Sequence, residues 1–506
     1  TLVDTALLAP AVAAVDRQFA DQPLVAANLQ LSLAQVYRRL GQNAPSHALA
    51  QRALATRQAQ LGAEHLDTAR AHHDLGYALE LLGDFAGAEG HYRTAFDLRT
   101  RQLGPDDALT LSSRLALGGS LRFQGKLEAA EPLLVEALDG ARRVLGARHR
   151  DTLAACNVLG YLRIDQGRLT AAEPLWREAH EQGVQAFGPG DPDTIVWTNN
   201  LGGLLDNLGK LRDGEALHRK ALAAALDRYG NAHPNTQSCQ NNLAINLTKQ
   251  GRFAEAEPVV REALAARQLA LGADHPDALD SMVTLGTLLR QRGQLEAAVD
   301  LLREAVQGRT RVLGPLHATT LTTKSMLALA LSNARQMAAA ESLYREVLAA
   351  PTSVWGPDHP DRLVVLNNYG SLLVTQDRRD EAEPLLRDLH TTRVRVSGID
   401  HPETLVAANS FARLREEQGH LVEAEALFRD TTERFRRVLG NEHTNTLMSL
   451  WNLGNNLLNQ QRAAEAEPLL REAALGLKRA LGNQHSRTGS AHRLLGKCLT
   501  TLGRHG

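Results

Sequence analysis

Histidine is the first residue type in this sequence whose pattern could support chemistry. Nine of the 19 histidines recur in one register, three residues after a glycine, in segments such as LGAEHLDT and YGNAHPNT. A row of histidines suggests a metal site, but consecutive copies are separated by two helix layers of ~8–10 Å each, whereas zinc ligands lie about 2 Å from the metal. We therefore predict that they cap helices instead. They are His65, His149, His233, His275, His317, His359, His401, His443 and His485.

No other pattern in the sequence predicts catalysis. The motifs HExxH, GxSxG and GxxxxGK[ST] are missing, and Cys156, Cys239 and Cys498 are too far apart for a CxxC or zinc motif. The glutamates of runs such as AEPLLREAA are expected on solvated helix faces, paired with arginine at helical spacing. Adjacent His72 and His73 point away from each other on one helix. We predict a protein that is not an enzyme and has no metal or cofactor.

Composition and charge exclude several classes of partner. Hydrophobic residues make up 43% of the chain and charged residues 22%, as in ordinary folded proteins. With 56 Lys and Arg against 57 Asp and Glu, the chain lacks the positive field on which nucleic-acid binding depends. Aromatic residues are only 4%, which favours helices over strands. The sequence has no apolar run that could span a membrane, and its cysteine usage fits a reducing compartment, so we expect a cytoplasmic protein.

The histidine-containing segments belong to a repeat that has a period of 42 residues and no insertion. A glycine begins each LGxxH-type segment, and a small residue recurs in a second phase. In a third phase the usual glycine is replaced by Arg335, Asp377 and Gln461. Two helices per repeat explain these phases: the first glycine ends the second helix, His or Asp caps the next first helix, and the small residue lets two helices approach closely. The small residues are Ala34, Gly76, Gly118, Gly160, Gly202, Ala244, Gly286, Ala328, Gly370, Ala412, Gly454 and Gly496.

Helix pairs with these phases resemble the tetratricopeptide repeat, whose usual period is ~34 residues. The 42-residue unit, as in NNLGGLLDNLGKLRDGEALHRKAL, is similar to the kinesin light chain type, and the Ala-, Leu- and Arg-rich repeats resemble bacterial members. The resemblance covers the chain from about residue 23. It implies an all-α fold, a right-handed α-α superhelix of about eleven and a half helix-turn-helix repeats. We expect residues 1–22 to form an N-terminal capping helix and residues 23–506 a single continuous solenoid.

The resemblance also implies where a ligand binds, because the first helices of tetratricopeptide arrays line a concave groove. The position three residues before the small residue, which faces that groove, is often asparagine here, as is the next position. Asparagine both donates and accepts hydrogen bonds, so a ladder of asparagines can hold the backbone of an extended peptide. Alternatively, these asparagines bond to the neighbouring helix and set the repeat spacing. The expected peptide-binding residues are Asn157, Asn199, Asn200, Asn241, Asn242, Asn367, Asn368, Asn409, Tyr161, Arg122, Lys249 and Arg290.

We therefore predict a scaffold for protein–protein interaction that binds a peptide or an extended protein segment in the groove. The alternative is the regulatory or sensor region of a larger signalling enzyme, such as a bacterial Ser/Thr kinase. A homo-oligomer joined through its end repeats is also open, because the last helix keeps apolar Leu494, Leu495 and Leu499. Pro351 and the two missing turn glycines predict a weaker region over residues 335–380.

Overall fold

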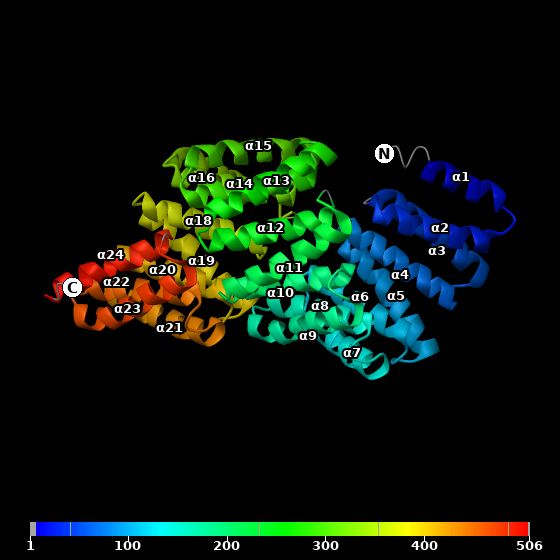
Figure 1. The fold of residues 1–506 in the computed structure, drawn as a ribbon, viewed down its shortest axis with the longest axis horizontal. Helices are drawn as coiled ribbons and strands as arrows, with labels where there is room; N and C mark the ends of the chain where they lie inside the picture. The colour runs from blue at the N-terminus through cyan, green and yellow to red at the C-terminus, as the bar shows by residue number, and fades with distance from the viewer. Residues whose placement is uncertain (1–6, 41, 232, 353, 484, 504–506) are drawn as a thin grey trace. The chain divides into compact units, whose positions relative to one another are not determined.

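The computed structural model describes residues 7–40, 42–231, 233–352, 354–483 and 485–503. Over these residues the chain forms α-helices joined by short turns, with no β-strand (Figure 1). The predicted all-α, helix-turn-helix architecture is confirmed. Of the expected N-terminal capping helix, residues 1–6 lie outside the described part of the chain, and α1 spans Ala9–Gln18.

The helices that follow α1 alternate between the two kinds that the repeat predicts. The first helices carry the small residue, and they are α2 (Pro23–Arg39), α4 (Leu66–Leu81), α6 (Ala108–Phe123), α8 (Arg150–Asp165), α10 (Pro192–Asn207), α12 (Pro234–Lys249), α14 (Pro276–Arg292), α16 (Ala318–Asn333), α18 (Pro360–Thr375), α20 (Pro402–Glu417), α22 (Thr444–Asn459) and α24 (Ser486–Thr501). The second helices are α3 (Asn43–Leu61), α5 (Phe85–Leu103), α7 (Leu127–Val144), α9 (Leu169–Phe187), α11 (Leu211–Tyr229), α13 (Phe253–Leu271), α15 (Leu295–Leu313), α17 (Met337–Leu348), α19 (Arg379–Ser397), α21 (Leu421–Leu439) and α23 (Ala463–Leu481).

The small residue of a first helix faces a large side chain of its own second helix, 16 residues further along the chain. A Cβ atom placed on Gly118 would lie 2.5 Å from Leu134 Cδ2, and one on Gly286 would lie 2.7 Å from Leu302 Cγ. Both leucines are fully buried. The close approach of the two helices therefore depends on the missing side chain. Gly76, Gly160, Gly202, Gly370 and Gly454 have the same relation to the residue 16 positions later.

The first helices from α4 to α24 begin at the side-chain caps that the sequence predicts. In each histidine cap, Nδ1 accepts a hydrogen bond from the backbone N–H two residues later, at 3.0–3.3 Å. Asp107 and Asp191 do the same through a carboxylate oxygen. An Nδ1 that accepts carries no proton, so the caps require neutral histidine. The capping role is confirmed for all nine histidines.

The turn between first and second helix holds a residue in the left-handed region. Where glycine is replaced, Arg335, Asp377 and Gln461 adopt φ of 63°, 63° and 64°. A left-handed conformation costs a non-glycine residue roughly 1–2 kcal/mol. The repeat geometry is therefore strong enough to impose this backbone on side chains that disfavour it.

Contacts divide the chain into two compact units. The first comprises Thr1–Asp165 with Leu175–Ala186, and the second comprises Gln166–Pro174 with Phe187–Gly506. In the second unit each first helix from α10 to α22 contacts the next first helix as well as its chain neighbours. Among the described residues, no second helix contacts the next second helix to a comparable extent. The first helices therefore form the more closely spaced, inner layer of this unit.

The helix pair around α17 departs from the regular repeat. α17 has 12 residues, whereas second helices such as α15 and α19 have 19. Pro351 follows its end, and Trp355, which is 1% exposed, stacks on the cap residue His359 at 5.4 Å between ring centroids. A buried aromatic ring in the connecting segment thus replaces the last two turns of a normal second helix.

We expect backbone amides of α17 and α18 to exchange with solvent faster than those of α14–α15 and α20–α21. A short helix buries less apolar surface, and the turns that flank this region hold Arg335 and Asp377 in the left-handed conformation. Local opening should therefore require less free energy here than in the regular repeats. Hydrogen–deuterium exchange followed by mass spectrometry measures this, and equal protection across all three helix pairs would show that the irregularity has no energetic effect.

Two adjacent glycines of α6 provide a matched test of the helix packing. Gly118→Ala should lower the free energy of unfolding by about 1–3 kcal/mol, because the new methyl group overlaps Leu134. Gly119→Ala should raise it by about 0.5–1 kcal/mol, because its nearest neighbour, Val158 Cγ1, lies 3.8 Å away and alanine favours helix. Urea denaturation of the two variants checks both signs, and equal effects would contradict the packing argument.

Candidate binding surfaces

Two asparagines of the expected ladder hydrogen-bond to the second helix of their own repeat. The buried Asn199 places Oδ1 2.8 Å from His218 Nδ1, and the other ring nitrogen of His218 lies 3.3 Å from Asp206 Oδ2. Asn409 Oδ1 accepts a 2.7 Å hydrogen bond from Thr431 Oγ1. For Asn199 and Asn409, the structure therefore shows the alternative role, in which the amide forms a hydrogen bond to the neighbouring helix.

Other members of the ladder leave polar atoms available. Asn241, Asn242 and Asn368 are half-buried, and their side chains make no hydrogen bond to another residue within the described chain. Asn367 Oδ1 is buried without a hydrogen-bond partner among the described residues, and this side chain lines a cavity of about 40 Å³ beside Val364. These amides lie on α12 and α18, two first helices of the inner layer. Asn200 of α10 is half-buried as well but is not one of these unpaired amides.

Exposed apolar side chains accompany the asparagines on the same first helices. Val196 precedes Asn200 by four residues, and Val364 precedes Asn368 by four, so each pair shares one helix face. Val196 is 39% exposed and Val364 is 40% exposed. The inner layer of the second unit therefore presents hydrogen-bonding amides and apolar patches side by side.

The three expected residues of the first unit form one packed cluster around Trp176. Tyr161 meets the Trp176 ring edge-on at 4.8 Å, and the Asn157 backbone oxygen accepts a 3.0 Å hydrogen bond from Trp176 Nε1. The Arg122 guanidinium lies 5.1 Å from the Tyr161 ring centroid and forms a 2.8 Å ion pair with Asp165. The charge of Arg122 is thus already compensated within the protein.

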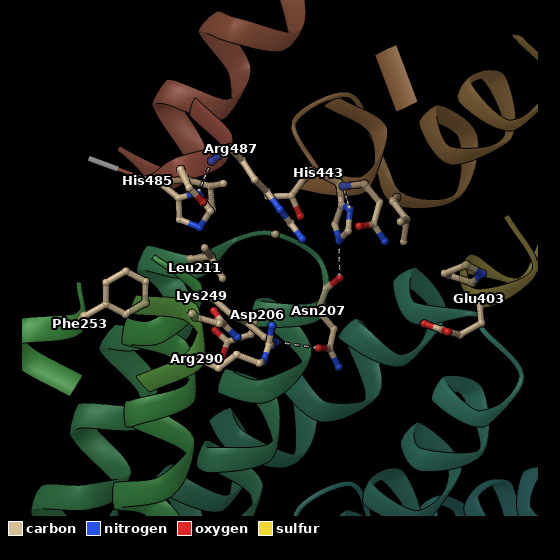
Figure 2. A pocket seen from close by; sticks show the side chains of 18 of the residues that line it. Asp206, Asn207, Leu211, Lys249, Phe253, Arg290, Glu403, His443, His485 and Arg487 are labelled. Atoms are coloured by element: carbon tan, nitrogen blue, oxygen red, sulfur yellow. Dashed lines mark hydrogen bonds between the residues drawn. The ribbon is translucent and has the colours of Figure 1, made fainter. Parts of the chain in front are cut away.

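Lys249 and Arg290, the remaining expected residues, line a pocket of about 660 Å³ in the second unit (Figure 2). The C-terminal ends of α10, α12, α14 and α16 form one wall, and the N-terminal ends of α20, α22 and α24 form the other. The walls also include Asp206, Asn207, His443, His485 and Arg487. The pocket brings together repeats that are far apart in the chain.

Repeated contacts between glycine turns and cap histidines close this pocket. His443 Nε2 lies 2.9 Å from the backbone oxygen of Asn207. A Cβ atom on Gly209 would lie 3.2 Å from His443 Cδ2, and one on Gly251 would lie 3.0 Å from His485 Cδ2. The pairs are Gly167 with His401, Gly209 with His443, and Gly251 with His485, and the partners in each are 234 residues apart. Glycine is therefore needed at these turns for close approach as well as for backbone conformation.

The pocket holds more cationic than anionic groups. Lys249 Nζ donates a 3.1 Å hydrogen bond to Asn207 Oδ1, and neither Arg290 nor Arg487 has a carboxylate partner among the described residues. Burial lowers the pKa of all three side chains below the usual values. Asp206 lines the same pocket but is buried and already engaged by His218 and Asn246.

Sequence reasoning identified Lys249 and Arg290 but did not find Arg487, His443 or His485 as their neighbours. All five residues lie in the repeat register, but that register does not predict which distant repeats meet. The turn glycines and the cap histidines each recur every 42 residues, but that period does not say which turn meets which cap. This contact depends on the curvature of the helical array.

No metal site is found among the described residues, and the three cysteines are buried. Within the described ranges, no group of three or more His, Cys, Asp or Glu residues could hold a metal ion. Burial raises the pKa of the Cys156 and Cys239 thiols to about 12, which disfavours thiolate chemistry. None of the helices in the described chain is long and apolar enough to cross a membrane.

Comparison with known proteins supports the repeat assignment. The sequence profile of the tetratricopeptide repeat matches along the chain, at residues 25–101, 78–143, 151–227, 194–268, 235–311, 283–353, 319–393, 361–437, 421–474 and 445–506. No curated protein matches the sequence.

Solved structures that are similar to parts of this chain include examples from Podosopora anserina and P. vanneervenii. One contains nearly identical TPR-like repeats of a kinesin light chain from Podosopora anserina; it is 23% identical, covers 41% of this chain and 97% of that chain, and has a TM-score of 0.35. Another is BtubC (BKLC) from P. vanneervenii, at 19% identity, with 46% of this chain and 91% of that chain covered and a TM-score of 0.38.

The histidine caps predict loss of stability in mild acid. Burial lowers the pKa of His401 to about 4 and also lowers the pKa of His359, His443 and His485, whereas an unfolded histidine titrates near 6.5. Between these values the unfolded chain binds more protons than the folded one, so stability falls as the pH falls. The contribution is complete above about pH 6.5, and His401 alone should lose on the order of 2 kcal/mol by about pH 4.

Urea denaturation at pH 7.5 and pH 5.0 measures this loss, with His401→Asn as the matched variant. Asparagine is a good cap that does not titrate, so the variant should lose less stability over this interval than the wild type. An equal loss in both proteins would show that the caps are not its source.

Proposed function

Because the chain belongs to the tetratricopeptide repeat family, we propose that its first helices bind an extended peptide. Its repeats are of the kinesin light chain type. Tetratricopeptide repeats typically act as non-catalytic scaffolds for protein–protein interaction. The observation that carries the proposal is the set of unpaired amides on α12 and α18, where Ile245 is 37% exposed and Val364 is 40% exposed. Such amides can pair with a peptide backbone, whose N–H and C=O groups both need partners. The apolar neighbours can receive side chains of the same peptide.

The asparagines fall into two groups, according to whether their side chains already form hydrogen bonds within the protein. Asn241, Asn242, Asn367 and Asn368 are the proposed direct contacts, because pairing with a peptide breaks no bond within the protein. Asn199 and Asn409 stabilise the helix pairs that carry the ladder and act as positioning residues.

The remaining expected residues supply selectivity in this proposal. Asn200 lies one position after the buried Asn199 and shares a helix face with Val196. In the first unit, Asn157, Tyr161 and Arg122 form a separate polar and aromatic patch around Trp176. Lys249 and Arg290 add positive charge at the ends of α12 and α14.

A preformed surface makes this binding efficient. The helices are fixed by their repeat packing, so the protein orders few groups when the peptide binds, and most of the entropy cost falls on the peptide. Affinity then comes from many weak contacts spread over several repeats. Removal of two amides should weaken binding substantially without abolishing the fold.

We expect the Asn242→Ala/Asn368→Ala variant to bind a selected peptide at least tenfold more weakly than the wild type. The peptide would be selected from a random display library against the full chain, and its dissociation constant would be measured by fluorescence anisotropy. Loss of two hydrogen bonds to a peptide at about 1 kcal/mol each accounts for this effect.

The control is Gln307→Ala, which removes an exposed amide from the second helix α15. It should leave the affinity unchanged, and circular dichroism should show the same helix content in all three proteins. Unchanged affinity in the double asparagine variant would exclude these amides from the binding surface.

A further inference from the structure

The pocket of Figure 2 has features that neither the fold nor peptide binding requires. It lies within the second unit, between the C-terminal ends of four first helices and the N-terminal ends of three later ones. Its volume of about 660 Å³ is within the range that suits a small organic ligand. Polar and charged side chains supply most of its lining, so an apolar ligand would find little to contact.

Three cations approach this pocket from both of its walls. Lys249 and Arg290 come from α12 and α14, and Arg487 comes from the first turn of α24. Figure 2 shows Lys249 and Arg290 close together beside Asp206, with Arg487 reaching toward them from the opposite wall, whereas the carboxylate of Glu403 lies apart from them beyond His443. Asp206 offsets part of this charge, but its oxygens already bond to His218 and Asn246. The lining therefore holds three cations against two carboxylates, those of Asp206 and Glu403.

Helix dipoles do not remove this imbalance. The carbonyl ends of α10, α12, α14 and α16 on one wall each carry about half a negative charge, and the N-terminal ends of α20, α22 and α24 on the other wall each carry about half a positive charge. The helix ends therefore sum to about half a negative charge, which is less than the excess of three cations over two carboxylates in the lining. The cap histidines each use one N–H of these first turns. The hydroxyls of Thr444 and Ser486, which also line the pocket, are further donors.

We propose that this pocket binds a small phosphate-bearing anion, held between the Lys249–Arg290 wall and Arg487. Two guanidinium groups and one ammonium group offer many N–H donors and no acceptor. Guanidinium groups match the oxygens of phosphate in a bidentate manner. Phosphate concentrates several acceptor oxygens and up to two negative charges on one centre, so it satisfies donors from both walls better than a single carboxylate does.

Binding at this place also links two parts of the helical array. The walls already touch through His443 and the Asn207 backbone, and through the glycine contacts of His443 and His485. An anion that contacts both walls adds charge-assisted hydrogen bonds to the same junction. The ligand therefore favours the closed arrangement of the second unit and raises the stability of the folded chain.

The test is calorimetric titration of the full chain with pyrophosphate, in a buffer free of divalent cations. We expect saturable binding of one pyrophosphate per chain, and dissociation constants at least tenfold larger for Arg290→Gln and for Arg487→Gln. Citrate at the same ionic strength should bind at least tenfold more weakly than pyrophosphate. Equal affinity for citrate would overturn the assignment to phosphate.

Matched controls separate this site from general charge effects and from peptide binding. Arg212→Gln and Lys220→Gln remove exposed cations of α11 that do not line the pocket, and they should leave pyrophosphate affinity unchanged. Arg487 is outside the proposed peptide surface, so Arg487→Gln should bind the selected peptide as the wild type does. Absence of saturable pyrophosphate binding, or the same loss in the controls, would overturn the proposal.

Thermal unfolding shows whether a variant loses binding because it fails to fold. Arg290→Gln and Arg487→Gln each remove a desolvated cation that has no carboxylate partner, so without pyrophosphate their Tm should equal or exceed that of the wild type. Pyrophosphate should raise the Tm of the wild type and of both controls, but not of these two variants. A pyrophosphate-dependent rise of the same size in all five proteins would contradict the site.

Discussion

The close approach of two helices at one small residue is the contact on which this structure depends. Gly118 against Leu134 and Gly286 against Leu302 show its form: a glycine without a side chain lets a buried leucine fill the space between the helices. The contact fixes the separation of a helix pair, and the 42-residue register repeats it without interruption. Small deviations would accumulate over successive pairs in a solenoid. The strictness of the register is therefore what makes contacts between distant repeats reproducible.

Local features were predictable from the sequence because they depend on neighbours in the chain. The cap histidines contact an N–H two residues away, and the turn residues close a bend of a few residues, so periodicity alone located both. Even the three replaced glycines keep the left-handed backbone, because the flanking helices determine it. A feature whose contacts lie within one repeat can therefore be predicted from the sequence of that repeat.

The asparagine ladder was only partly predictable, because each amide depends on the residue that the second helix places opposite it. Asn199 already forms a hydrogen bond within the protein, because His218 occupies the repeat position where other repeats have residues such as Leu134 or Leu302. Asn242 and Asn368 have no such partner. The sequence identified the ladder but not which amides remain available, since that depends on contacts between helices.

The pocket was not predictable, because it depends on the curvature of the array. Its closure places His443 in two roles that a single tautomer satisfies: Nδ1 accepts from the first turn of α22, and protonated Nε2 donates to Asn207. The same neutral histidine therefore starts a helix and joins two distant repeats. The adjoining Lys249, Arg290 and Arg487 are cations removed from bulk water without full compensation, which costs free energy. The repeated core can tolerate that cost because each helix pair adds its own stabilising contacts. The pocket can therefore keep a charge distribution that suits a bound anion, although it lowers the stability of the protein without a ligand.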